Sequence, residues 1–238
     1  MNHDFEIFRQ ADRLSALADA GEHLNNYLAE NKKRPILLML SGGSCLEMLE
    51  YLSPSSLGEN ITVSMLDERF SMESDVNNFA QMQKLDFYNV ALEAECSFFG
   101  TLPRAGETPQ DLQKRWDANL KNWREQNPNG ITIATLGMGA DGHTAGIFPF
   151  DNETEFKKIF TDDTWTVAYN VGEKSQHPER LTTTPAFFKL IDFAVAFVVG
   201  QEKREKLETA IKNQGDVYEV PALAWHEIKE VKVFTDIK

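Results

Sequence analysis

Short, continuous apolar runs separated by longer amphipathic stretches recur along the chain. Apolar runs of this length predict buried β-strands, and the expected strands are residues 36–40, 61–66, 131–136, 193–199 and 231–234. Amphipathic stretches over 45–52, 78–89, 108–126 and 201–212 predict helices between them. Apolar strands that alternate with helices indicate an α/β fold with a doubly wound, mostly parallel sheet that has helices on both faces.

The N-terminal region before the first of these strands has a different pattern. Its apolar side chains, Phe5, Phe8, Leu14, Leu17 and Leu24, are spaced as on one face of an acidic amphipathic helix over residues 2–34. No repeat, low-complexity tract or linker divides the remaining sequence. We therefore expect a single domain over residues 1–238, with 1–34 as an N-terminal helical segment.

Composition excludes several classes of protein. The 238 residues are 42% hydrophobic, which is too apolar for a disordered chain, and 24 Lys and Arg against 37 Asp and Glu give a net charge of −13. A nucleic-acid binder needs clustered cations to neutralise phosphates, so this balance argues against one. A small anionic ligand needs only a local group of cations, because distant charges are largely screened at physiological salt.

The sequence also indicates where the protein is located, whether it crosses a membrane and whether it binds a metal. Two cysteines, Cys45 and Cys96, are too few for a disulfide scaffold, and we expect free thiols. The N-terminus has neither the basic nor the apolar region of a secretory signal, and the longest apolar runs are too short to span a bilayer. The five histidines form no metal-ligand spacing. We expect a cytoplasmic protein with no membrane partner and no metal site.

Ligands of parallel sheets bind beyond the carboxyl ends of the strands, so the residues that follow each apolar run are informative. Ser41, Gly42, Gly43 and Ser44 follow the first run and precede an expected helix. Glycine lets a ligand approach the main chain, and a helix N-terminus attracts anions. The segment is either an anion-binding loop or a plain strand-to-helix turn.

Three further segments carry charged side chains of interest. Asp67 and Arg69 come at the end of the second run, either as a surface ion pair or at the mouth of the ligand crevice. Arg180 follows Lys174 in a polar segment, and arginine suits bidentate binding of phosphate, although a plain surface loop has the same composition. Lys203 lies in the first turn of a helix, where a cation opposes the helix dipole. That misfit favours a ligand role.

The segment 136–149 carries the most specific signal. Four glycines, at 137, 139, 142 and 146, form a long loop after an apolar strand, and the loop presents Asp141 and His143. Histidine is the side chain best suited to proton transfer near neutral pH. A neighbouring carboxylate can fix its tautomer or stabilise its charged form. We expect a catalytic role for this pair.

These segments, in this order, resemble the 6-phosphogluconolactonases, within the larger group that includes the glucosamine-6-phosphate isomerases (deaminases). The resemblance covers the chain from about residue 35 to residue 236, and it implies a Rossmann-like fold of the sugar-phosphate isomerase type. It rests on Ser-Gly-Gly-Ser at 41–44, Leu-Asp-Glu-Arg at 66–69, Gly-Ala-Asp-Gly-His-Thr-Ala-Gly-Ile-Phe-Pro at 139–149, Arg-Leu-Thr-Thr-Thr at 180–184 and Val-Gly-Gln-Glu-Lys at 199–203.

One position separates the two branches of this group. The deaminases typically have a glutamate five residues after the histidine, and here that residue is Phe148, which cannot carry a proton. The sequence after His143 is similar to the lactonase pattern Thr-Ala-Ser-Leu-Phe-Pro, with Gly146 in place of the common serine. Cys45 and Phe150 also depart from the lactonase pattern and would reshape the rim of the pocket.

The resemblance implies hydrolysis of 6-phosphoglucono-1,5-lactone to 6-phosphogluconate, in the oxidative pentose phosphate pathway, without a cofactor. It implies that His143 is the general base, that Asp141 orients it, and that Arg180 and Lys203 bind the phosphate together with residues 41–44. The alternatives are a glucosamine-6-phosphate deaminase-like enzyme and a non-catalytic sugar-phosphate sensor. We expect a sugar phosphate as partner, no nucleic acid, and a monomer or small homo-oligomer.

Overall fold

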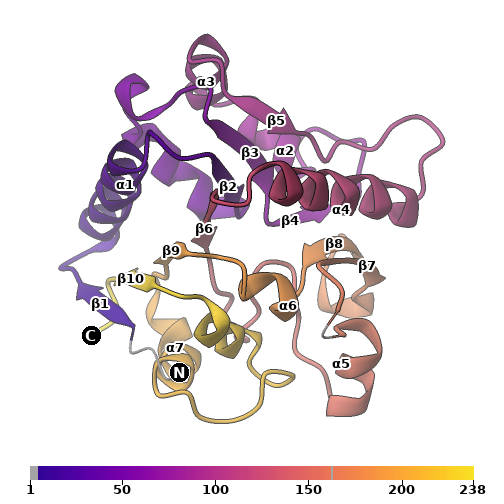
Figure 1. The fold of residues 1–238 in the computed structure, drawn as a ribbon. Helices are drawn as coiled ribbons and strands as arrows, with labels where there is room; N and C mark the ends of the chain where they lie inside the picture. Colours follow the sequence, from indigo (N-terminus) through magenta and orange to yellow (C-terminus); the bar gives the residue numbers. More distant parts are fainter. Residues whose placement is uncertain (1–4, 162) are drawn as a thin grey trace.

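The structure is a computed structural model that describes residues 5–161 and 163–238. A seven-stranded parallel sheet forms its centre (Figure 1). From one edge to the other, its strands are β1 (Glu6–Arg9), β10 (Val231–Thr235), β9 (Phe193–Phe197), β6 (Ile131–Leu136), β2 (Ile36–Leu40), β3 (Ile61–Met65) and β5 (Ser97–Phe99). The mostly parallel sheet expected from the apolar runs is confirmed.

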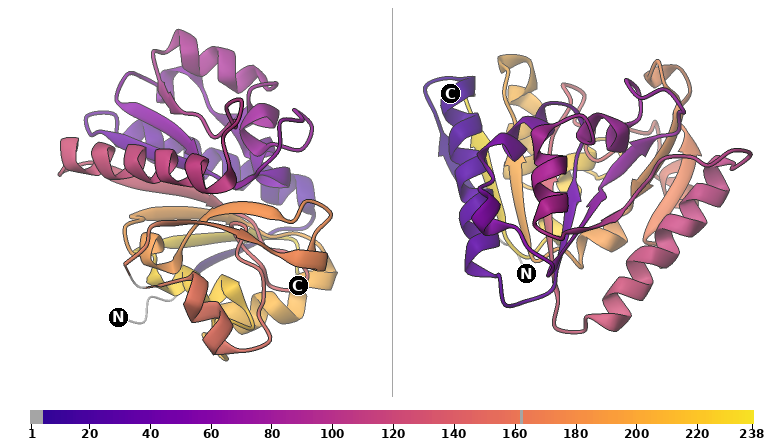
Figure 2. Two further views of the ribbon diagram at one scale, coloured as in Figure 1. Left: turned by 90° about the vertical axis from the view of Figure 1, so that its right-hand side faces the viewer. Right: turned by 90° about the horizontal axis from the view of Figure 1, so that it is seen from above.

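Both faces of the inner strands β2, β3, β6 and β9 are buried, which explains why these strands are mostly apolar. Alternate side chains of β2, such as Leu37 and Leu38, enter two separate hydrophobic cores. One core contains α4 (Pro109–Gln126) and the other contains α1 (Arg13–Glu30). The two helices lie on opposite sides of the sheet in the view from above (Figure 2).

The remaining helices are short. They are α2 (Asn78–Met82), α3 (Asp86–Glu93), α5 (Glu153–Ile159), α6 (Pro185–Phe188) and α7 (Arg204–Ile211), with 3₁₀ helices η1 (Gly43–Tyr51), η2 (Pro54–Ser56), η3 (Gly172–Lys174), η4 (Gln201–Lys203) and η5 (Pro221–Glu227). The helix expected over 45–52 is therefore a 3₁₀ helix, the one expected over 78–89 is divided into α2 and α3, and the one expected over 201–212 begins as η4 and continues as α7.

A second, antiparallel sheet lies beside the first and was not predicted. It joins β4 (Asp67–Arg69), β8 (Glu179–Thr183) and β7 (Thr166–Asn170), so that segments expected to be a turn and a surface loop are strands. These strands are short and polar, and two of them carry arginine side chains of the pocket. No local hydrophobic pattern reveals them, and β4 pairs with β8 across a large separation in sequence.

The expected helix over residues 2–34 is wrong in its first part. Residues Glu6–Arg9 form β1, which pairs with β10 at the sheet edge, and the ring of Phe8 stacks on Phe234 at 4.7 Å between centroids. Pairing with the sheet outweighs the helical spacing here. The helix begins only at Arg13, where the side chain of Asp12 accepts a hydrogen bond from the backbone N–H of Ser15 at 2.8 Å. Residues 1–4 of that segment lie outside the described residues.

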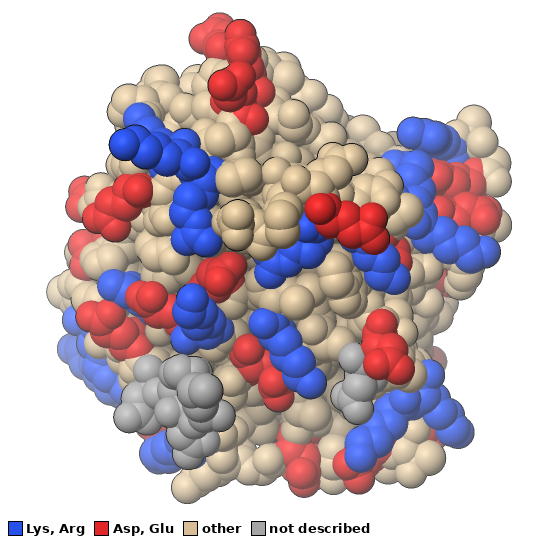
Figure 3. Space-filling model, in the orientation of Figure 1, with Lys and Arg blue, Asp and Glu red and all other residues tan. Residues whose placement is uncertain are grey.

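Positive and negative side chains are interspersed on the face of the molecule shown in Figure 3. In the described part of the chain, no helix is long and apolar enough to cross a membrane.

Candidate active site

A pocket of about 280 Å³ opens at the carboxyl ends of β2 and β6, two neighbouring strands of the parallel sheet. The chain runs from β2 toward one edge of the sheet and later returns through β6 toward the other, so the pocket lies where the direction of winding changes. Nine of the ten expected site residues line it: Ser41, Gly42, Gly43, Ser44, Asp67, Arg69, His143, Arg180 and Lys203. The tenth, Asp141, contacts His143 from outside the lining.

The turn after β2 provides main-chain groups for the pocket. Its first residue, Ser41, is fixed to β6, because its N–H and its hydroxyl both bond to Thr135, at 2.9 and 2.8 Å. Gly42 is the N-cap of η1, which begins at Gly43, and it provides no side-chain hydrogen bond to the first N–H groups of that helix. A Cβ on Gly42 would lie 2.3 Å from Oδ1 of Asn78, so glycine is required for this loop to pack against α2.

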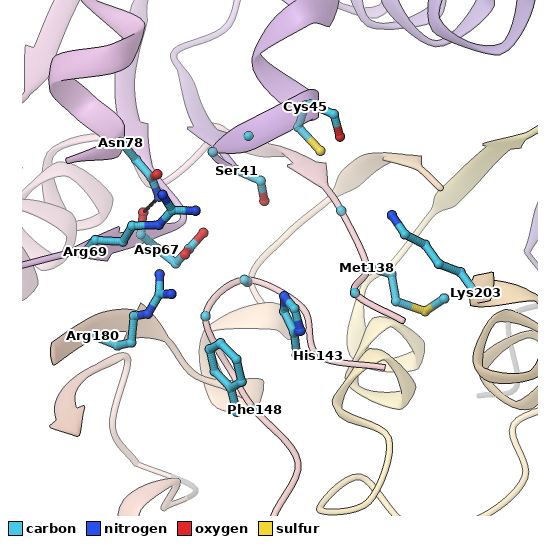
Figure 4. A pocket seen from close by; sticks show the side chains of 17 residues that line it. Ser41, Cys45, Asp67, Arg69, Asn78, Met138, His143, Phe148, Arg180 and Lys203 are labelled. Atoms are coloured by element: carbon cyan, nitrogen blue, oxygen red, sulfur yellow. Dashed lines mark hydrogen bonds between the residues drawn. The ribbon is translucent and has the colours of Figure 1, made fainter. Parts of the chain in front are cut away.

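The small sheet places two guanidinium groups at the pocket. Arg69 on β4 is the direct cross-strand partner of Arg180 on β8, and both side chains reach the pocket beside Asp67 (Figure 4). Arg180 is 6% exposed, and burial lowers the pKa of its guanidinium, while the charge of Asp67 acts against that effect. Burial also raises the pKa of the Asp67 carboxyl, against the charges of Arg180 and Arg69. Two adjacent guanidinium groups, one buried and one partly buried, form a site that suits an anionic ligand.

Glu68, which lies between Asp67 and Arg69 on β4, supports the wall of the pocket without lining it. Its fully buried carboxylate accepts hydrogen bonds from the backbone N–H groups of Arg69, Asn78 and Phe79 and from the hydroxyl of Thr101, at 2.6 to 3.0 Å. Burial raises the pKa of Glu68 to about 7, although the four hydrogen bonds lower it. One carboxylate therefore ties β4 to the start of α2.

The glycine-rich loop after β6 carries the titratable pair. Nδ1 of His143 lies 2.6 Å from Oδ1 of Asp141, which also accepts the backbone N–H of His143 at 3.0 Å. The pKa of Asp141 is lowered overall. Partial burial acts to raise it, but the hydrogen bond to His143 and the charge of that residue outweigh burial, so the carboxylate is ionised. Because an ionised carboxylate only accepts, Nδ1 carries the proton and Nε2 is left as the basic nitrogen.

Gly139 makes this arrangement possible. A Cβ at this position would lie 2.2 Å from Nδ1 of His143 and 2.8 Å from Oδ1 of Asp141. Any larger residue would push the imidazole away from its carboxylate. The glycine spacing in the sequence thus reflects a close approach of the loop backbone to its own side chains.

Phe148 packs directly on the imidazole. The two rings are stacked, with centroids 4.6 Å apart and planes inclined by 15°. The guanidinium carbon of Arg180 lies 5.4 Å from the centroid of the same phenyl ring. The phenyl ring therefore separates the imidazole from the guanidinium, and no carboxylate occupies this position.

Lys203 enters the pocket from the other side, on η4 after β9 (Figure 4). In the part of the chain that the structure describes, no salt bridge joins it to its acidic neighbours in sequence, Glu202 and Glu205. Lys174 is not in the pocket lining, and its ammonium donates to the carbonyl of Pro149 at 2.5 Å. Of the two lysines noted in the sequence, the structure brings only Lys203 to the site.

The site residues expected from the sequence did not include Asn78 and Met138, which line the pocket; Cys45, expected at the pocket rim, lines it as well. Asn78 is 2% exposed and donates through Nδ2 to the carbonyl of Asp67 at 3.1 Å, so it joins α2 to the arginine-bearing strand. The sequence signal for Asn78 was the Asn-Asn pair at 77–78, which follows the Asp-Glu-Arg motif at 67–69. Among residues 5–161 and 163–238, no group of three or more His, Cys, Asp and Glu side chains could hold a metal ion.

Comparison with known proteins gives a consistent result. Residues 11–234 match the family model described as glucosamine-6-phosphate isomerases/6-phosphogluconolactonase. The chain is 31% identical over 178 residues to the 6-phosphogluconolactonase of Xylella fastidiosa (strain 9a5c), covering 73% of this chain and 71% of the relative. It is 30% identical over 186 residues to that of Haemophilus influenzae, covering 73% and 72%.

Solved structures share the fold. A 6-phosphogluconolactonase from Shewanella baltica aligns with a TM-score of 0.71 at 21% identity, covering 99% of both chains. A 6-phosphogluconolactonase from Trypanosoma cruzi aligns with a TM-score of 0.76 at 17% identity, covering 99% of this chain and 96% of the other.

Proposed function

Since the chain belongs to the family of glucosamine-6-phosphate isomerases and 6-phosphogluconolactonases, we propose that it hydrolyses 6-phosphoglucono-1,5-lactone to 6-phosphogluconate. This is the second step of the oxidative pentose phosphate pathway, and we place the enzyme in the cytoplasm, as a monomer or small homo-oligomer. The observation that carries the proposal is the His143–Asp141 pair, with Nδ1 and Oδ1 2.6 Å apart, in a pocket that also holds Arg69, Arg180 and Lys203.

His143 acts as the general base in this mechanism. Nε2 takes a proton from water as the water oxygen bonds to the lactone carbonyl carbon, which gives a tetrahedral intermediate. When the carbon–ring oxygen bond breaks, the imidazolium returns the proton to the leaving oxygen, and the product is the open-chain acid. Asp141 holds the Nδ1–H form and stabilises the charged imidazole between the two steps.

The cations of the pocket bind the substrate phosphate. Arg180 reaches the pocket from β8 and Lys203 from η4, and the Ser41–Ser44 turn brings the backbone N–H groups of Gly42, Gly43 and Ser44 to the start of η1. Negative charge that develops on the carbonyl oxygen also needs a donor. Arg69 or an N–H of the glycine-rich loop can serve, since both line the pocket.

Phe148 favours lactone hydrolysis over deamination of an amino sugar. The deaminase pattern has a glutamate at this position as a second proton carrier, whereas here a phenyl ring is stacked on the imidazole. A single base and acid suffices for lactone hydrolysis, because the same proton is taken from water and returned to the ring oxygen.

The test uses purified protein and three measurements. We expect acid release from freshly generated lactone well above the spontaneous rate, and no ammonia release from glucosamine 6-phosphate. Ammonia release without lactone hydrolysis would replace the proposal with a deaminase. If neither substrate turned over while 6-phosphogluconate raised the melting temperature, the protein would be a sugar-phosphate sensor.

A further inference from the structure

The turn between His143 and Phe148 has an unfavourable backbone. Thr144 and Ile147 pair through N–H···O bonds of 3.2 and 2.7 Å, and the two residues between them, Ala145 and Gly146, have φ angles of 48° and 73°. Alanine rarely adopts the left-handed region, so contacts from outside the turn must stabilise it.

The hydroxyl of Tyr169 makes such contacts. It donates to the carbonyl of Gly146 at 2.7 Å and accepts from the backbone N–H of Phe148 at 3.1 Å. Burial raises the pKa of this phenol, so it stays protonated and can do both. Tyr169 is 8% exposed and is not in the lining of the pocket, so it reaches the reaction only through other residues.

Phe148 connects this bridge to the catalytic pair. Its backbone is held by Tyr169, and its ring is stacked on the imidazole of His143 (Figure 4). The position of the Phe148 backbone therefore determines where the ring that supports His143 lies. Thr182, on the adjacent strand β8, donates from its hydroxyl to the carbonyl of Ala145, so the small sheet holds the turn at a second point.

We propose that Tyr169 is a positioning residue for the general base: by bridging Gly146 and Phe148, its hydroxyl fixes the phenyl ring that holds the His143 imidazole in its reactive orientation. This inference rests on the proposed lactonase function. It assigns the small antiparallel sheet a second role, since the cross-strand partner of Tyr169 is Arg180, a cation of the pocket. One strand pair thus supports both the base and the anion site.

Tyr169→Phe removes the hydroxyl and keeps the ring, so it tests the bridge with little change in packing. We expect kcat for the lactone to fall by about tenfold, because small displacements of a reacting group are costly. We expect KM to stay within about twofold, because Tyr169 contacts no substrate and the phosphate contacts come from other residues. The matched control is Tyr27→Phe on α1, whose ring packs against Phe193 and whose loss of a hydroxyl should leave both parameters unchanged.

A double-mutant cycle separates positioning from general loosening. Phe148→Leu should also lower kcat, and adding Tyr169→Phe to it should cost little more, since the hydroxyl acts through the phenyl ring. Additive losses, or an unchanged kcat in Tyr169→Phe, would overturn the proposal. So would a loss confined to the melting temperature.

A measurement without substrate keeps this test independent of the proposed function. In the ligand-free protein, the imidazole protons of His143 experience the ring current of Phe148, and their NMR shifts should move in Tyr169→Phe but not in Tyr27→Phe. If the wild type failed to hydrolyse the lactone, the proposed function would fall, while these shifts would still decide whether Tyr169 positions His143. Unchanged shifts in Tyr169→Phe would contradict the positioning role.

Discussion

The two sheets contribute different things to one pocket. The parallel sheet presents main chain and loop at its strand ends: the Ser41–Ser44 turn after β2 and the His143 loop after β6. The antiparallel sheet presents side chains from within its strands, above all the cross-strand pair Arg69 and Arg180. The general base and the arginine pair are therefore carried by different sheets, while Lys203 and the Ser41–Ser44 turn bring the rest of the proposed anion site to the parallel sheet. Loss of His143 should therefore change mainly kcat, and loss of an arginine of this pair should change mainly KM.

The largest effect is expected on the parallel sheet. His143→Ala removes the base, and kcat should fall by about 10²- to 10⁴-fold with little change in KM. Steady-state rates of acid release, corrected for spontaneous hydrolysis, measure this loss. His23→Ala on α1 is the matched control, since its ring packs on Phe8 and Phe234 away from the pocket, and it should keep wild-type kcat. A kcat in His143→Ala equal to that of the wild type would refute the role of the loop.

The next effect concerns the antiparallel sheet. Arg180→Met keeps much of the side-chain volume and removes a charged donor, so KM should rise by about 10- to 100-fold, as expected for the loss of charge-assisted hydrogen bonds. Arg124→Met, which removes an arginine at the end of α4, should leave KM unchanged. If Arg180→Met lowered kcat and left KM as it was, the division between the two sheets would not hold.

The contact that Glu68 makes between β4 and α2 should matter for stability more than for turnover. Glu68→Gln places an amide N–H₂ where only acceptors fit, and we expect a loss of about 1–3 kcal/mol in unfolding free energy. The matched control is Glu50→Gln at an exposed position of η1, which should change stability little. Urea titrations of both variants measure the difference, and equal stabilities would show that the four hydrogen bonds of Glu68 contribute little.

Glu68 also predicts a dependence of stability on pH. Burial raises the pKa of its carboxyl from an ordinary value of 4.5 to about 7, so between these values the folded state binds a proton that the unfolded state has released. The contribution of Glu68 to stability is therefore present at pH below 4.5 and falls as pH rises toward 7. Unfolding free energies measured across this range should decline less steeply in Glu68→Gln than in the wild type. Parallel pH profiles would contradict this assignment.

The smallest effect concerns Cys45, which lines the pocket on the side of the parallel sheet. Burial raises the pKa of its thiol to about 12, and Cys96 is buried as well. Both thiols should react with Ellman's reagent much more slowly in the native protein than in guanidinium chloride. Rapid reaction of Cys45 in the native state, measured in Cys96→Ala, would show that the pocket opens around Cys45.

The same contrast explains what the sequence could predict. Every residue of β2, β3 and β6 is buried, so each appears as a continuous apolar run and its following loop can be searched for chemistry. His143, Lys203 and the Ser41–Ser44 turn were found in that way. β1 was not found, because four residues paired at a sheet edge have no apolar run of their own.

The small sheet lay beyond sequence reasoning for a different reason. Its strands carry charged residues such as Asp67 and Glu179, and their pairing is a property of the folded chain. Arg69 and Arg180 could be listed as candidates, but only the β4–β8 register places them side by side. The hydroxyl bridge of Tyr169 depends on distances that no spacing in the sequence encodes.

A crystal structure with bound 6-phosphogluconate would test the central claim most directly. Our account predicts the phosphate between Arg180, Lys203 and the Ser41–Ser44 turn, with the C1 carboxylate next to Nε2 of His143. A carboxylate bound at Arg180 and Lys203 with the phosphate beside His143, or a product molecule bound outside this pocket, would contradict it.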